Sequence, residues 1–198
     1  GESNFLKAKL IFDAGEALNP AIDIGQVEGA FIQGCGLMSS EEVDYDETTG
    51  FNITNTTWEY KPFFPKSIPC EFSVDMFPSE ENKVDEDYKQ AIEYRKRQRA
   101  KVHGVDPGVM SSKSTGEPPV VVAISMFQAI RDALRSHQDN LYRKFSPEKT
   151  PQQAVIDFRE APASVSRIQH AVHRINSSHN TGTNGNSNFI SLLSSLND

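Results

Sequence analysis

Apolar and polar residues alternate in two stretches of this chain. Every second residue from Leu6 to Phe12 is apolar, and the same period recurs from Cys70 to Met76. Alternation of this kind is typical of strands with one buried face. We therefore predict strands at about 5–12 and 68–77. Between them, the segment 41–61 reads as a hairpin or meander, with its turn near Gly50.

A helical period begins after the first strand. Apolar residues in 23–43 are roughly helically spaced, and Pro20 follows Asn19 near a possible helix start. Glycines recur along this segment, and each costs a helix interior about 1 kcal/mol relative to alanine. They suggest that another backbone or a ligand approaches this helix closely. These glycines are Gly25, Gly29, Gly34 and Gly36.

The second half of the chain predicts further helices. The highly charged segment from about Asp85 to Lys101 has acids early and bases late, as in an exposed helix. A strongly apolar helix follows Pro119 and is the best candidate for the core. A short helix is predicted at 151–159. From residue 161 the sequence is polar and we expect a mostly disordered tail, with a short helix at 164–175.

Composition narrows the class of protein. Of the 198 residues, 37% are hydrophobic and 24% charged, so we expect a core over part of the chain and a solvated or disordered remainder. The net charge of −7 argues against nucleic-acid binding. We see no apolar run long enough for a membrane span and no signal peptide, and we expect a cytoplasmic protein. The two cysteines, Cys35 and Cys70, then read as reduced thiols.

Few residues offer chemistry. The sequence lacks the usual nucleotide-binding, zinc-protease and nucleophile-elbow motifs, and His170 and His173 have no third ligand, so no metal site is assigned. Glu117 stands in "KSTGEPPVVV", ahead of an apolar helix. It could stabilise the helix N-terminus by its charge, pair with Lys113, or face a pocket as a general base.

Two glutamines on the glycine-rich helix form the other candidate site. Gln26 and Gln33 are seven residues apart and so lie on one face of the predicted helix. Beside glycines, such a face suits a polar ligand with many hydrogen-bonding groups. An ordinary polar helix face is the alternative.

Taken together, these segments resemble a known family. "LNPAIDIGQVEGAFIQGCGL" is followed in order by "IPCEF" and "SKSTGEPP", and then by an apolar helix. This order and spacing resemble the C-terminal part of the molybdenum-cofactor-binding domain of the xanthine dehydrogenase and aldehyde oxidase family. The resemblance covers about residues 7–158. It implies an α+β fragment of that domain, with mixed strands packed on helices, followed by the tail.

The resemblance also implies roles for particular residues. Glu117 matches the general base of a reaction that hydroxylates aldehydes or N-heterocycles such as purines, with water as the oxygen source. Gln26 matches a contact to the cofactor, molybdopterin. The family positions matched by Gln33, Gly29, Lys113 and Gly116 lie near that cofactor. The implied partners are a small-molecule substrate and the remaining domains of an enzyme that forms a homodimer.

Other features depart from the family pattern. Family enzymes are many times longer and carry iron–sulfur clusters and usually a flavin. Two cysteines cannot hold a cluster, so we expect these groups only in the missing parts of a full-length parent protein. The segment 79–109 resembles a charged insert within a unit spanning 1–160, and 161–198 a foreign polar tail. We therefore expect a fragment that is inactive by itself. A stand-alone remnant that acts as an interaction module is the alternative. The substrate and the electron acceptor cannot be assigned from these residues.

Overall fold

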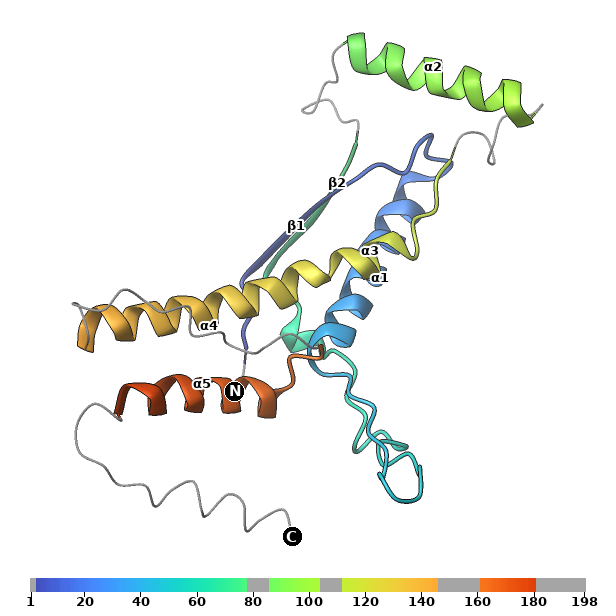
Figure 1. The fold of residues 1–198 in the computed structure, drawn as a ribbon. Helices are drawn as coiled ribbons and strands as arrows, with labels where there is room; N and C mark the ends of the chain where they lie inside the picture. The colour runs from blue at the N-terminus through green and yellow to red at the C-terminus, as the bar shows by residue number, and fades with distance from the viewer. Residues whose placement is uncertain (1–2, 78–85, 104–111, 146–160, 181–198) are drawn as a thin grey trace.

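The computed structural model describes residues 3–77, 86–103, 112–145 and 161–180 (Figure 1). These residues form helices and a small sheet, in agreement with the α+β class predicted from the sequence. The elements are, in chain order, β1 (Lys7–Phe12), α1 (Pro20–Ser39), a 3₁₀ turn (Pro65–Ser67), β2 (Glu71–Met76), α2 (Glu86–His103), α3 (Pro118–Val122), α4 (Ile124–Phe145) and α5 (Val165–Asn180).

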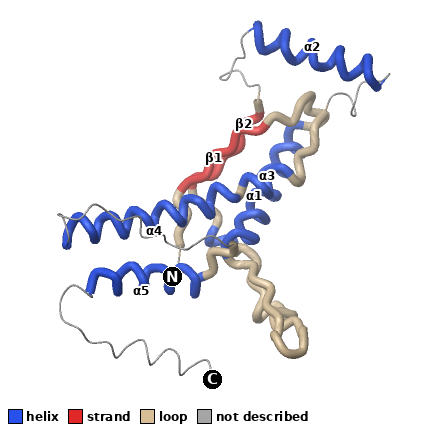
Figure 2. Tube along the Cα trace, viewed as in Figure 1, coloured by secondary structure: helices blue, strands red, loops and turns tan. Residues whose placement is uncertain are grey.

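Both predicted strands are confirmed, and they pair in parallel. The register runs from Lys7 opposite Glu71 to Phe12 opposite Met76, and within the described residues the sheet has these two strands only (Figure 2). One face is charged, and there Lys7 pairs with Glu71 at 2.8 Å. The other face is apolar and packs on α1, where the rings of Phe31 and Phe72 stack with centroids 5.7 Å apart.

The glycine-rich helix is confirmed as α1. It begins at Pro20 because the Asn19 side chain accepts a hydrogen bond from the backbone N–H of Ile22 at 3.4 Å. It ends at Ser39, four residues before the predicted end at residue 43. The close approach expected at its glycines occurs at Gly34, which packs against the backbone of α3.

The predicted core helix is present in two pieces, α3 and α4, which are separated by a turn at Ala123. The backbone N–H of Ala123 is shared between the carbonyls of Pro119 and Val120, each at 3.3 Å, so the chain stays nearly helical there. This region joins the sheet to α1. The core between them consists of Leu10, Val27, Phe31, Cys35, Ala123 and Met126.

The segment from residue 161 differs from the expected tail. The short helix predicted at 164–175 is present, but it is longer, as α5, and it packs beside α4 (Figure 1). Ile168, Ala171 and Ile175 recur at helical spacing among polar residues and are buried, so α5 belongs to the fold. The core between α4 and α5 consists of Phe127, Ile130, Leu134, Ala163, Ile168, Ala171 and Ile175. Residues 181–198 and the predicted helix at 151–159 lie outside the described residues.

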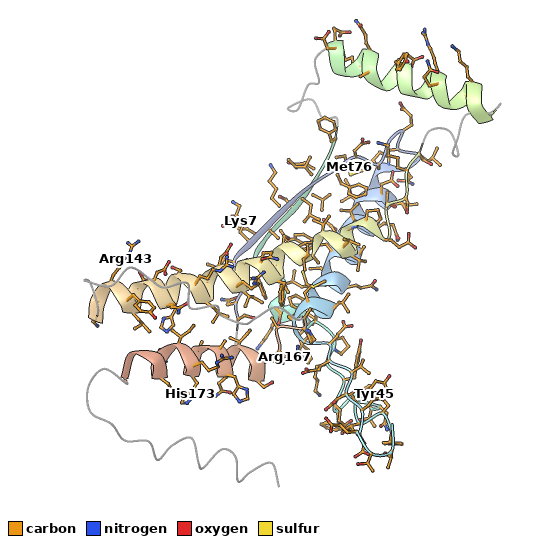
Figure 3. The ribbon with its side chains drawn as sticks, viewed as in Figure 1. Lys7, Tyr45, Met76, Arg143, Arg167 and His173 are labelled. Carbon is orange, nitrogen blue, oxygen red and sulfur yellow. The ribbon has the colours of Figure 1, made fainter. Side chains whose placement is uncertain are left out.

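Two segments project from this body. The charged helix predicted at about 85–101 is confirmed as α2, which stands apart from the other helices in Figure 1. The predicted hairpin is reduced to one antiparallel bridge, between Tyr45 and Asn52, and Figure 3 shows Tyr45 on this outlying loop. No helix in the described part of the chain is long and apolar enough to cross a membrane.

Candidate functional site

The loop before α3 lies against the end of β1. The backbone N–H of Lys113 donates to the carbonyl of Ala14 at 2.9 Å, and Ser112 forms an antiparallel bridge with Gly15. The Lys113 ammonium pairs with the Asp13 carboxylate. Two segments that are far apart in the sequence are thereby joined directly before Glu117.

Glu117 occupies the position that precedes α3, and its side chain is exposed. It makes no side-chain cap of that helix, and instead its Oε2 accepts a hydrogen bond from Ser114 Oγ at 3.3 Å. The pairing with Lys113 that the sequence left open is not formed, since that ammonium is held by Asp13. The Glu117 carboxylate therefore faces outward, next to a helix that starts with two prolines.

Gln26 reaches this loop from α1. A Cβ added at Gly116 would lie 3.9 Å from Gln26 Oε1, so the amide of Gln26 sits directly beside the residue before Glu117. The structure thus brings together the two parts of the site that the sequence analysis considered separately. Gln33 is exposed about two turns further along the same helix, and no described contact joins it to the loop.

The exposed face of α1 carries little side-chain bulk. A Cβ at Gly25 or at Gly29 would meet nothing within 4 Å, whereas the face that carries Val27 and Phe31 is buried. A surface without side-chain bulk, bordered by the amides of Gln26 and Gln33, can accept a flat polar group with several hydrogen-bonding atoms. The residues present therefore fit one wall of a pterin site.

Asp13 was missed by the sequence analysis, although it follows directly after a predicted strand. Partial burial acts to raise the pKa of its carboxyl. The hydrogen bond from Lys113, the backbone N–H of Gly15 and the charge of Lys113 together outweigh this, so the pKa of Asp13 lies below its ordinary value. The side chain is therefore a carboxylate at neutral pH.

The other reactive groups lie away from this loop. Burial raises the pKa of the Cys35 thiol to about 12, so this thiol is not a nucleophile at neutral pH. Within the described ranges, no three His, Cys, Asp or Glu side chains come together as a metal-ligand set. The chemistry available here is therefore that of one outward carboxylate beside an amide-lined helix face.

Comparisons with known proteins show which family the chain resembles. Residues 1–69 match the model of the molybdopterin cofactor-binding domain. The chain is 35% identical to an indole-3-acetaldehyde oxidase of Zea mays over 83% of its own length and 10% of that protein. It is 36% identical to the xanthine dehydrogenase/oxidase of Rattus norvegicus, over 80% of this chain and 11% of that protein.

A third relative agrees. The abscisic-aldehyde oxidase of Arabidopsis thaliana is 35% identical over 68% of this chain and 8% of that protein. The chain thus spans about a tenth of the length of the curated relatives that it matches. The chain belongs to the xanthine dehydrogenase and aldehyde oxidase family of molybdenum oxidoreductases and carries part of its molybdopterin cofactor-binding domain.

Proposed function

We propose that this chain forms one wall of a molybdenum hydroxylase active site, with Glu117 as its general base. One observation carries the proposal. The exposed carboxylate of Glu117 follows Gly116, and Gly116 lies beside Gln26 on the open face of α1. A base and an amide-lined surface for a pterin therefore stand side by side.

The proposed substrates are aldehydes or N-heterocycles such as purines. Relatives of this chain are named for indole-3-acetaldehyde, abscisic aldehyde and xanthine. The molybdenum cofactor, when bound, would supply the redox centre that takes up the electrons of the oxidation. Glu117 would accept a proton from the water that provides the oxygen atom, a contribution of about 10²–10⁴-fold for a positioned base.

Gln26 would hold the cofactor through its side-chain amide, and Gly29 and Gly116 would let it approach the backbone closely. Gln33 is assigned to the same surface with fewer supporting contacts. Iron–sulfur clusters and a flavin belong to other parts of a longer family protein. We infer that those parts also cover Glu117, because a general base works best where bulk water is excluded, and that the assembled enzyme is a homodimer.

The proposal is tested in a complete family protein. This chain replaces the matching region of the maize indole-3-acetaldehyde oxidase, and variants with Glu117 and with Glu117→Gln are compared for turnover, KM and molybdenum content. We expect Glu117→Gln to lower kcat by about 10²–10⁴-fold at equal molybdenum content. The control is Glu47→Gln, which changes an exposed acid in the outlying loop. Normal turnover of the Glu117→Gln protein would show that Glu117 is not the base.

A further inference from the structure

The end of β1 holds an aspartate in a fixed position. Asp13 Oδ1 accepts a hydrogen bond from the backbone N–H of Gly15 at 2.9 Å. Gly15 has a φ of 67°, a conformation that favours glycine, so the chain turns sharply there and directs its N–H back to the carboxylate. The Asp13 side chain is 33% exposed, which leaves it half-buried beside the strand. Its other oxygen, Oδ2, is the one that receives Lys113.

Lys113 contacts the end of β1 through two interactions. Its backbone N–H donates to the carbonyl of Ala14 at 2.9 Å, and its ammonium pairs with Asp13. One contact fixes the main chain and the other fixes the side chain of the same residue. The start of the loop that leads to Glu117 (residues 112–117) is therefore held against the end of β1.

The far end of the loop is fixed by different contacts. Pro119 is buried, and a Cβ at Gly34 of α1 would lie 2.5 Å from the carbonyl oxygen of Val120, so α3 packs tightly on α1. Between these two anchors stand Ser114, Thr115 and Gly116. Gly116 is permissive and adds no rigidity, so the position of Glu117 depends on both anchors.

We infer that the Asp13–Lys113 pair is a clamp that positions Glu117, an inference that rests on the function proposed above. It assigns Lys113 a role other than the cofactor contact implied by its family position, because its ammonium already has a partner in Asp13. A base displaced by about 1 Å can lose about 10²-fold in rate. An ion pair this exposed adds little to the stability of the fold. The clamp should therefore affect catalysis more than folding.

The test uses variants that break the pair and variants that restore it. Asp13→Asn and Lys113→Met remove it, Lys113→Arg preserves it, and the exchange of Asp13→Lys with Lys113→Asp reverses it. Lys7→Met is the matched control, because it removes an exposed ion pair of the same strand that does not touch the loop.

Two readouts are compared. In the complete family protein carrying this chain, we expect Asp13→Asn and Lys113→Met to lower kcat about tenfold with KM unchanged. Lys113→Arg should keep turnover within about twofold, and the exchanged pair should recover part of the loss. In the full chain, hydrogen exchange of the peptide 112–117 should be several-fold faster in the broken variants than in Lys7→Met.

These readouts separate the two proposals. If Glu117→Gln abolishes turnover while Asp13→Asn and Lys113→Met change neither kcat nor exchange, the clamp is wrong and the base assignment stands. If Glu117→Gln turns over normally, the base assignment is wrong, and unchanged exchange in the broken variants would overturn the clamp as well. Failure of the exchanged pair to recover any of the lost turnover also counts against the clamp.

Discussion

Gly34 is the residue on which the contact between α1 and α3 depends. An added Cβ would lie 2.5 Å from the carbonyl oxygen of Val120 and 2.6 Å from the Cβ of Ala123. Because the obstacle is mainly backbone, Gly34→Ala should lower the free energy of unfolding by about 1–3 kcal/mol, measured by urea denaturation.

Gly29→Ala is the matched control for this change, since a Cβ there meets nothing within 4 Å. Alanine is the better helix former by about 1 kcal/mol, so this variant should gain up to that amount. Equal stability of the two alanine variants would mean that α1 and α3 do not pack as described.

Asp13 gives the stability of the chain a defined pH dependence. Its pKa is lower in the folded state than in the unfolded state, so its contribution is complete above the ordinary pKa of about 3.8. The contribution is lost as the pH falls through the lower, folded pKa. Because the pair is partly exposed, urea midpoints of wild type and Asp13→Asn should differ only slightly at pH 6, and this small difference should vanish towards pH 3. A difference that grows on acidification would contradict this.

The two thiols should react at different rates. Cys35 is buried and its pKa is raised to about 12, whereas Cys70 is exposed. A disulfide reagent such as dithionitrobenzoate should modify Cys70 in the folded chain and both cysteines in urea. Rapid modification of both in the folded chain would show that the core around Cys35 is open.

The sequence analysis singled out Glu117 and Gln26 but not the contacts that hold the loop before Glu117. Glu117 and Gln26 belong to long, unusual motifs, so roles could be proposed for them from resemblance. The clamp was missed because Asp13 and Lys113 are far apart in the chain, and no local spacing reports a contact between such positions. A pairing between Lys113 and Glu117 was one of the alternatives that the sequence left open, and in the structure Lys113 pairs with the more distant Asp13.

At the level of secondary-structure elements, the spacing of apolar residues and the capping residues predicted more of the structure than the composition did. Both strands and α1, α2 and α4 appear near their expected positions, since each has an alternating or helical pattern or a charge gradient of its own. The helix expected at 164–175 in the polar tail is present, but its packing against α4 was not predicted. Ile168, Ala171 and Ile175 form an apolar stripe there, but the surrounding Ser, His and Asn residues dominate the composition.

The packing of α5 on α4 through these apolar residues can be tested by substitution. Ile175 is 4% exposed against α4, whereas Val165 at the other end of α5 is 57% exposed. Ile175→Ala should cost about 2–5 kcal/mol of unfolding free energy, and Val165→Ala should cost much less. Equal urea midpoints for the two variants would show that α5 is not part of the fold.

At the level of the molecule, the described surface carries large exposed apolar side chains. Trp58 in the segment 41–61 is 83% exposed, and Val121 in α3 is 70% exposed. A groove of about 360 Å³ lies between β1 and the start of α4, lined by residues such as Phe31, Pro119 and Met126. We propose that other parts of a longer family protein cover these side chains, since this chain spans about a tenth of the length of its relatives.

The most direct measurement of the central claim is the rate at which an aldehyde reduces the molybdenum centre, without an electron acceptor, in a complete family protein that carries this chain. The account predicts that Glu117→Gln lowers this rate by about 10²–10⁴-fold while the molybdenum content stays the same. An unchanged rate at equal molybdenum content would contradict it.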